Sequence, residues 1–542
     1  MSRTVADLVL TGGLVTTMAE DGTGVPAEAE ALAIVGDRIA AVGTADEIDG
    51  WTGPDTRIVD LAGRRVVPGL IDTHVHFARA GFTWNDEVRW GTVTSLAEGL
   101  ALIAERARST PAGTWIMVIG GWDPAQFSER RHPTRDELDE AAPEHPVMIQ
   151  HLYSYGMLNS AALARVPLAR AIDEGIDPAT VETDDAGTPT GLVRTMTALR
   201  WLYAQLPVPS LEEQVASTAA AGRELATFGV VGLIDGGGAN TGPDVYRPLF
   251  ETWRRGELVP RVRLTVHSSG PGREEEDLDG ITRFVHPRQG DERLSVLGVG
   301  EIMMWPMHDG VDRLPDLAQE HRDRIEAILR SCAERGWTVQ MHLFRPETTD
   351  VVVDMWRRIH ADIPLSDLRW TIVHGESVTA EHAEVLASMS AGVICEAILR
   401  MEGEHIAELW GADAVRAAPD VRALQAAGVR IAAGSDGMRV ATYNPFATLQ
   451  WLTTGRSLSG TQIWDESVVL DRHEALALLT TQSAWFSFEE GSRGRLQPGF
   501  LADVAVLDQD YLEVDASELP AIRADLTVIG GQVVHDASAQ AR

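Results

Sequence analysis

Residues 66–76 read VVPGLIDTHVH, a nearly continuous apolar run that ends in two histidines. Such a run predicts a buried strand. Side chains at positions i and i+2 of a strand point to the same side, so His74 and His76 face the same space. Neutral imidazoles in this arrangement suit zinc and related ions. A His-x-His pair is equally compatible with a structural role, so the remaining chain has to supply further ligands.

The middle of the chain alternates apolar strand-like runs with segments of helical period, which is the pattern of consecutive βα units. Eight candidate strands lie at 66–76, 229–235, 263–267, 295–304, 338–344, 370–374, 392–397 and 429–436. We therefore predict an α/β protein with a closed (β/α)8 TIM barrel. The segment from about 77 to 225 is too long for one βα connection, so it is expected to be an insertion that covers the barrel mouth. It contains two strand candidates of its own, 115–119 and 147–152.

Both ends of the chain are rich in short strand-like runs separated by glycine turns. They lie at 6–11, 31–35 and 39–42 near the start, and at 502–507, 526–529 and 532–535 near the end. This distribution predicts a small β-sandwich domain that is split between residues 1–65 and 490–542. The barrel then occupies residues 66–489.

Three more candidate ligands stand at or near the ends of apolar strands: His342, His374 and Asp436. Enzymes with this barrel build their active sites at the carboxyl ends of the strands. Together with His74 and His76, these residues predict a metal centre at that end of the barrel.

On these motifs the sequence resembles the amidohydrolase superfamily. The run that ends in His74 and His76, the two later single histidines and the sequence GSD at 434–436 follow that superfamily's ligand order. The stretches GRLQPGFLAD at 494–503 and IGGQVV at 529–534 resemble its return to the small β-domain, so the likeness covers essentially the whole chain. GGWD at 120–123 and PTRDELD at 133–139, leading to Asn159-Ser160, are similar to the branch that contains N-substituted formamide deformylases.

The chain departs from that branch at two places. Leu152-Tyr153-Ser154 stands where the branch usually has Asp-Gly-His, and GVGE at 298–301 stands where it usually has a lysine on the fourth strand. Both departures argue against assigning that branch's typical substrates to this chain.

The resemblance implies roles for the five ligands. His74, His76 and Asp436 are expected to hold a first divalent ion, and His342 and His374 to hold a second ion or to assist the substrate. Asp436 is also expected to take the proton from the attacking water and to deliver it to the leaving nitrogen. Asp436 and His374 are therefore the catalytic candidates, and zinc is the expected ion, in one or two copies.

The chain has no lysine, so all 46 basic residues are arginine. Many two-metal members of the superfamily bridge their ions with a carboxylated lysine, which cannot form here. A glutamate also offers two oxygens, and Glu301 is the acid on the fourth strand. Its apolar neighbours make an unpaired carboxylate costly. We therefore expect Glu301 to bridge the ions; the alternative is that it faces outward or pairs with an arginine.

Composition limits the possible partners. A net charge of −34 argues against nucleic acid and acidic membrane surfaces, because the protein's field repels them. Two cysteines, no long apolar run and no leader pattern over Met1 to Leu8, which carries Arg3 and Asp7, favour a cytoplasmic protein. A small-molecule substrate is expected, and a homo-oligomer is compatible with the sequence.

The leading hypothesis is hydrolysis of a C–N bond in an amide, an N-formyl compound or a cyclic amide. Two alternatives remain at this point: deamination of an amino-substituted heterocycle, and a metal-binding protein without turnover. Further residues considered for the site are His151, Tyr153, Tyr155, His308, Asp309, Arg345 and Glu376.

Overall fold

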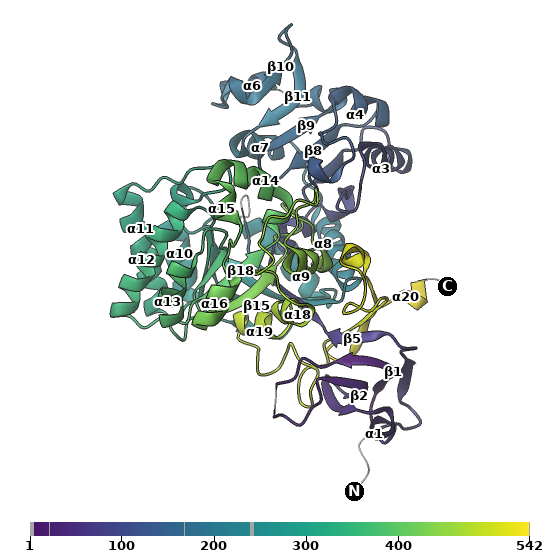
Figure 1. Ribbon diagram of the computed structural model, residues 1–542. Coiled ribbons are helices and arrows are strands. Elements are labelled where there is room, and N and C mark those ends of the chain that lie inside the picture. The colour runs from purple at the N-terminus through teal and green to yellow at the C-terminus, as the bar shows by residue number, and fades with distance from the viewer. Residues whose placement is uncertain (1–4, 21, 167, 239–242, 541–542) are drawn as a thin grey trace.

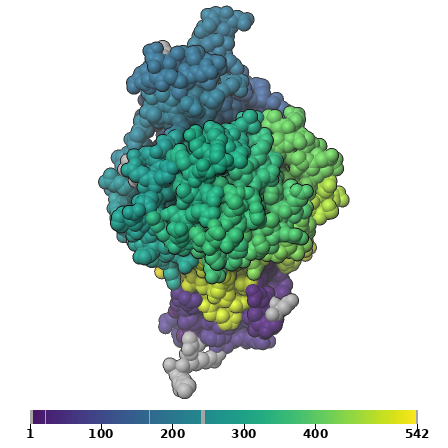
Figure 2. Space-filling model, turned by 90° about the vertical axis from the view of Figure 1, so that its left-hand side faces the viewer, coloured from purple at the N-terminus to yellow at the C-terminus, as the bar shows by residue number. Residues whose placement is uncertain are grey.

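The computed structural model describes residues 5–20, 22–166, 168–238 and 243–540 (Figure 1). Arg3, in the N-terminal segment considered above, lies outside them. A barrel occupies the middle of the molecule, and a sheet built from both ends of the chain lies below it in this view. The segment between the first two barrel strands lies at the top. Figure 2 shows these three layers again from the side.

Eight parallel strands form the barrel, each paired with the next in chain order. They are β6 (Leu70–Val75), β12 (Val230–Asp235), β13 (Arg261–Val266), β15 (Leu294–Glu301), β16 (Val339–Leu343), β17 (Thr371–His374), β18 (Gly392–Glu396) and β19 (Arg430–Gly434). The first and last strands meet where the amide of Asp436 donates to the carbonyl of His74 at 2.9 Å. The predicted TIM barrel is confirmed.

Helices connect the barrel strands. They are α8 (Leu211–Ala226), α9 (Pro243–Arg254), α10 (Glu274–Phe284), α11 (Gln319–Glu334), α12 (Pro346–Asp362), α13 (Ala380–Ser388), α14 (Ile398–Trp410), α15 (Ala412–Val415) and α16 (Val421–Ala427), with α17 (Pro445–Thr454), α18 (Arg472–Leu478) and α19 (Thr481–Phe486) after the last strand. Figure 1 shows α10 to α13 side by side on the outer surface. Their buried apolar faces pack with the strands into one continuous core.

The predicted strand over residues 66–76 is divided in the structure. Residues Arg65–Pro68 form β5, which belongs to the terminal sheet, and β6 starts at Leu70. A side-chain carbon on the intervening Gly69 would lie 2.3 Å from a methyl group of Val231. A glycine is therefore required where the chain passes from one sheet to the other, because the backbone approaches β12 so closely.

Both ends of the chain contribute strands to one sheet, in the order β22-β21-β20-β5-β1-β2-β3, with β4 beside β1. The bounds are β1 (Leu8–Thr16), β2 (Glu28–Val35), β3 (Arg38–Gly43), β4 (Arg57–Asp60), β20 (Val504–Leu507), β21 (Ala524–Ile529) and β22 (Gln532–Asp536), with the short helices α1 (Ala45–Asp49) and α20 (Ala537–Gln540). The antiparallel pairing of β20 with β5 joins the two ends. The division at residues 65 and 490 stays a prediction.

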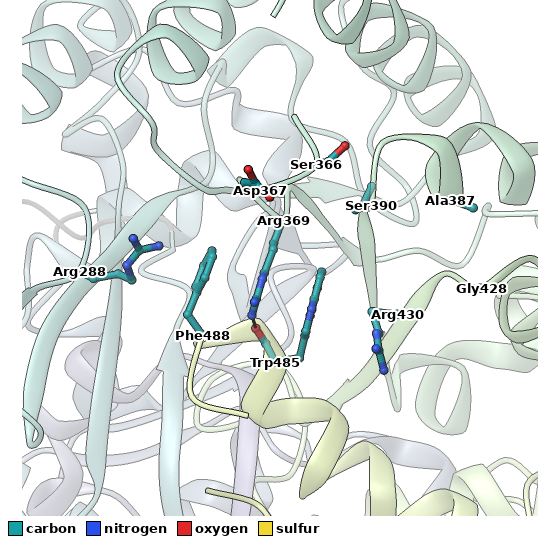
Figure 3. A pocket seen from close by; sticks show the side chains of 11 residues that line it. Arg288, Ser366, Asp367, Arg369, Ala387, Ser390, Gly428, Arg430, Trp485 and Phe488 are labelled. Atoms are coloured by element: carbon teal, nitrogen blue, oxygen red, sulfur yellow. Dashed lines mark hydrogen bonds between the residues drawn. The ribbon is translucent and has the colours of Figure 1, made fainter. Parts of the chain in front are cut away.

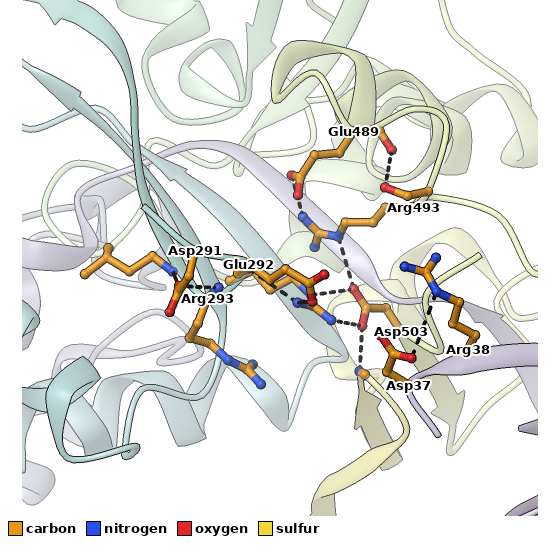
Figure 4. A network of polar contacts seen from close by, with 12 residues as sticks. Asp37, Arg38, Asp291, Glu292, Arg293, Glu489, Arg493 and Asp503 are labelled. Carbon is orange, nitrogen blue, oxygen red and sulfur yellow. Dashed lines mark hydrogen bonds and ion pairs between the residues drawn. The ribbon is translucent and has the colours of Figure 1, made fainter. Parts of the chain in front are cut away.

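A buried network of charges ties this sheet to the barrel (Figure 4). The Asp503 carboxylate accepts from the Nε atoms of Arg261 and Arg493, at 3.0 and 3.1 Å. Glu489 accepts from Arg493 at 2.8 Å and from Arg263 at 2.7 Å. Arg261 and Arg263 belong to β13, and Asp503 immediately precedes β20. Because buried charges are costly without partners, the network fixes the position of the terminal sheet against the barrel.

The segment between β6 and β12 forms its own sheet, in the order β10-β11-β9-β8-β7. Its strands are β7 (Ile116–Ile119), β8 (Val147–His151), β9 (Tyr155–Leu158), β10 (Val181–Thr183) and β11 (Pro189–Arg194). Its helices are α2 (Phe77–Gly81), α3 (Leu96–Ser109), α4 (Arg135–Ala141), α5 (Ser160–Leu163), α6 (Leu168–Asp173) and α7 (Met196–Tyr203). The two strands predicted here correspond to β7 and β8. In the described part of the chain, no helix combines the length and apolarity that crossing a bilayer requires.

Candidate metal centre

All six predicted ligands converge at the carboxyl end of the barrel. His74 lies on β6 and His76 follows it, Glu301 and His374 end β15 and β17, His342 lies on β16, and Asp436 follows β19. Every one of them is buried except His342, whose side chain is 11% exposed. The structure therefore brings together residues that are spread over more than three hundred positions of the sequence.

Glu301 lies at the centre of the cluster. Its Oε2 atom is 3.4 Å from His74 Nε2, 3.6 Å from His342 Nδ1 and 3.8 Å from His374 Nε2. The carboxylate points into the barrel, and none of its ion pairs in the described chain is with an arginine. Asp436 Oδ1 lies at the edge of the same cluster, 2.9 Å from His76 Nε2 and 3.7 Å from His74 Nε2.

Several of these buried atoms have no hydrogen-bond partner among the described residues. They include both ring nitrogens of His74, Nδ1 of His342, Oε2 of Glu301 and Oδ1 of Asp436. Buried polar atoms nearly always have a partner, because an unsatisfied one costs free energy. The set combines imidazole nitrogens with carboxylate oxygens, which suits a divalent ion such as zinc. The residues present therefore fit a metal ion at this position.

Contacts between the first and last strands position His74. The Asp72 carboxylate accepts from the hydroxyl of Ser435 at 2.6 Å and from its amide at 2.9 Å, and it also accepts from the amide of His74 at 3.2 Å. Gly236 leaves room for the ring, since a side-chain carbon there would lie 2.3 Å from His74 Cε1, and Gly434 leaves room for the backbone and Cβ of His74, at 2.8 Å from the latter. The motifs IDTHVH and GSD thus hold each other in place.

Two of the ligands have unusual backbone conformations. His374 has a φ of 73° and Asp436 has a φ of 50°, a region that residues other than glycine seldom adopt. Such conformations cost about 1–3 kcal/mol and persist where the surrounding structure holds them, often at active sites. Here they turn the His374 and Asp436 side chains toward the other ligands.

The charges within the cluster stabilise one another. Burial alone would lower the pKa of His76, but its hydrogen bond to Asp436 and the charge of that carboxylate raise it to about 9. Burial would raise the pKa of Glu301, but the neighbouring imidazoles of His342 and His374, together with His74 and His76, hold it well below its usual range. Asp436 likewise keeps a lowered pKa because His76 outweighs burial. The two carboxylates are therefore anionic at neutral pH, as metal ligands must be.

Sequence reasoning missed Glu396, the last residue of β18. It is 2% exposed, and its Oε2 atom lies 2.5 Å from Nδ1 of His374. A carboxylate on the second nitrogen of a ligating histidine orients the ring and strengthens it as a donor. A charged residue at the end of an otherwise apolar barrel strand was the available signal.

The remaining candidate residues divide between the site and its surroundings. Asp309 Oδ1 lies 3.0 Å from His342 Nε2, and the His308 ring lies 4.3 Å from the His342 ring, so both adjoin the cluster. Glu376 is buried beyond His374. His151 stacks on Tyr155 inside the insertion, with ring centroids 5.0 Å apart.

The cluster opens into a cavity of about 940 Å³ at the barrel mouth. Residues from the insertion, among them Tyr153, Ser154 and Arg200, line one wall of it. His76, Glu301 and His374 line the floor. The insertion therefore contributes directly to the space in which a substrate can lie.

A second cavity, of about 670 Å³, lies at the opposite end of the barrel strands (Figure 3). Arg369 stands between the rings of Trp485 and Phe488, with its guanidinium carbon 4.7 and 4.2 Å from their centroids. Its lining contains no histidine, and its single acid is Asp367. This cavity therefore offers no set of metal ligands like that at the carboxyl end.

A TIM barrel with four histidines and two carboxylates at the carboxyl ends of its strands defines the class of protein as a metal-dependent hydrolase. The profile of the Amidohydrolase family matches residues 57–535, so the chain belongs to that family, and the predicted hydrolysis of C–N bonds is confirmed at this level.

Comparison with individual proteins agrees with this assignment. The chain is 26% identical to N-substituted formamide deformylase from Arthrobacter pascens, over 93% of this chain and 94% of that protein. An uncharacterized metal-dependent hydrolase from Pyrococcus horikoshii superposes with a TM-score of 0.65 at 20% identity, over 94% of this chain and 99% of that one. Atrazine chlorohydrolase from Arthrobacter aurescens, complexed with zinc, superposes with a TM-score of 0.52 at 14% identity, over 98% and 95%. The two structures show the shared fold.

Proposed function

We propose that the protein hydrolyses the C–N bond of a small amide, N-formyl compound or cyclic amide, with one or two zinc ions as cofactor. The observation that carries the proposal is the position of Glu301, whose carboxylate lies between histidines from three other strands on the floor of an open cavity. The likeness to a formamide deformylase along almost the whole chain supports the choice of bond.

The donors fall into two groups that share Glu301. His74, His76 and Asp436 would hold one ion, and His342 and His374 would hold the other. A divalent ion, when bound, polarises a carbonyl group and lowers the pKa of a coordinated water. The Glu396 carboxylate holds the ring of His374 in place.

Asp436 is the proposed proton carrier. Its Oδ1 atom has no hydrogen-bond donor other than the histidine cluster, and Asp436 lines the cavity where a substrate amide would lie. As an anion it can accept the proton of the attacking water, and it can then donate that proton to the leaving nitrogen. Such general acid–base work contributes roughly 10²–10⁴-fold to the rate.

The proposal is tested by turnover of a substrate panel with zinc-loaded and chelated protein. The panel contains N-acyl, N-formyl, cyclic-amide and amino-heterocycle compounds. We expect hydrolysis in at least one of the first three classes with loaded protein only. Turnover confined to amino-heterocycles would establish a deaminase instead, and binding of zinc without any turnover would support the non-catalytic alternative.

Glu301→Gln tests the bridge. The neutral amide keeps the shape but loses the charge that faces two groups of histidines, so metal content should fall from about two ions toward one and turnover should fall with it. Metal analysis and circular dichroism measure occupancy and fold. Glu87→Gln is the matched control, because Glu87 is also buried but bonds only to Thr83, away from the cluster. A single ion in the wild type, with occupancy and rate unchanged in Glu301→Gln, would show that no bridge exists.

A further inference from the structure

Two arginines on the cavity wall have no carboxylate partner among the described residues. Arg200 lies on α7 in the insertion, and Arg313 lies in the loop after β15. The Arg200 guanidinium carbon is 5.3 Å from the ring centroid of Trp305, and Arg313 donates to the carbonyl of Trp305 at 3.0 Å. The second contact of Arg313 is the sulfur of Met196 at 3.7 Å. Neither arginine forms an ion pair.

This arrangement is unusual for the chain, which has 80 acidic and 46 basic residues. Burial lowers the pKa of Arg313, the charge of Asp309 opposes this shift, and the nearby charge of Arg200 adds a smaller lowering. Asp309 does not neutralise the pair, because its oxygens are bonded to His342 and to the amide of Arg345. Two neighbouring cations that form no ion pair repel each other, and an anion bound between them removes the repulsion.

The pair lies within reach of the metal centre. The ring of Trp305 is 6.3 Å from the ring of His308, which is 4.3 Å from the ring of His342. The cavity between them is lined by apolar side chains such as Ile302 and Phe344 and by polar ones such as His308. A small molecule can therefore lie with one end at the cluster and the other at the arginines.

We infer that Arg200 and Arg313 form a carboxylate-binding subsite, so that the substrate is an amide with a carboxylate on the side away from the scissile bond. This inference rests on the proposed function. A guanidinium group matches the two oxygens of a carboxylate with parallel hydrogen bonds. Water adds to the amide carbonyl carbon, the C–N bond breaks, and the nitrogen leaves with the proton. The carboxylate takes no part in that exchange and serves to orient the bond. Arg345 does not contribute, because it bonds to Val311 and Glu347.

Matched substrate pairs test the subsite. N-formylphenylalanine is compared with N-formyl-2-phenylethylamine, and 4-(formamidomethyl)benzoate with N-benzylformamide, since the members of each pair differ only in the carboxylate. We expect kcat/KM to be at least about tenfold higher for the acid in one pair. Each of the variants Arg200→Gln and Arg313→Gln should lower kcat/KM for the acid roughly 10- to 100-fold, the scale of a lost hydrogen bond to a charged group. The kcat/KM of the neutral compound should stay within about threefold of its wild-type value.

Controls separate this inference from the proposed function. Arg322→Gln is the matched control, because Arg322 is also partly buried and donates to a backbone carbonyl, but lies outside the cavity. Arg313→Lys keeps the charge without the paired donors, so it should retain part of the preference for the acid that Arg313→Gln loses.

Calorimetric binding of 4-(formamidomethyl)benzoate gives a readout independent of turnover. Its affinity should weaken at least about tenfold in both glutamine variants. Equal rates and equal binding in wild type and variants would overturn the subsite while C–N hydrolysis stands. Failure of every N-acyl, N-formyl and cyclic-amide compound to react, with binding still lost in the variants, would contradict the proposed function alone.

Discussion

Asp436→Asn is expected to lower kcat by at least roughly 10²-fold, the lower end of the general acid–base scale. The asparagine retains an oxygen that can face the ion, but it cannot accept and return a proton. Its neutral side chain also removes the charge that raises the pKa of His76. The expected result is therefore a folded protein that keeps most of its metal and loses most of its turnover.

The measurement is kcat across the pH range, with metal content determined on the same samples. Asp367→Asn is the control, because it changes an acid at the opposite end of the barrel and should leave kcat unchanged. Asp503→Asn is not suitable, because it removes the negative charge that pairs with the buried Arg261 beneath the barrel. A near-normal kcat for Asp436→Asn at every pH would place the catalytic base elsewhere.

His74→Ala is expected to abolish turnover. His74 is fully buried, and its Nε2 atom lies within 3.8 Å of three carboxylates, those of Glu301, Glu396 and Asp436. Without the imidazole the ion loses a ligand, and the three carboxylates repel one another across the space that the ring filled. Both metal content and activity should therefore fall to background. Chelation of the wild type should have the same effect, and added zinc should restore the wild type only.

His535→Ala provides the matched comparison, since His535 is also buried but donates to a carbonyl in the terminal sheet. It should retain metal and rate if it folds. Full activity of His74→Ala, or active wild-type protein without a stoichiometric transition metal, would contradict the metal-dependent mechanism.

Much of the barrel could be predicted from the sequence because most of its strands are buried apolar runs; β13, which carries Arg261 and Arg263, is the exception. All eight predicted runs overlap the barrel strands. The break at Gly69 was not predictable, since it depends on how closely Val231 approaches from another strand. Three strands of the insertion, β9 to β11, were missed because they carry no clear alternation of apolar and polar residues.

The five ligands suggested by motif and strand position, and Glu301, lie together as expected. Glu396 was missed because a single acid at the end of a strand gives no motif. The pair formed by Arg200 and Arg313 could not be recognised either, because one comes from the insertion and the other from a loop more than a hundred residues later. Only the closed fold places both beside Trp305.

The charge network beneath the barrel also affects how the protein is made. Arg261 is synthesised 242 residues before Asp503, the buried carboxylate that neutralises it. Until that residue leaves the ribosome, the nascent chain holds a barrel strand whose guanidinium has no buried counter-ion, and β5 has no β20 beside it. Domains commonly fold in order from the N-terminus during synthesis. Here β5, β13 and the segment that carries Glu489, Arg493 and Asp503 depend on one another, so the barrel is fixed against the terminal sheet only after residue 503 has been synthesised.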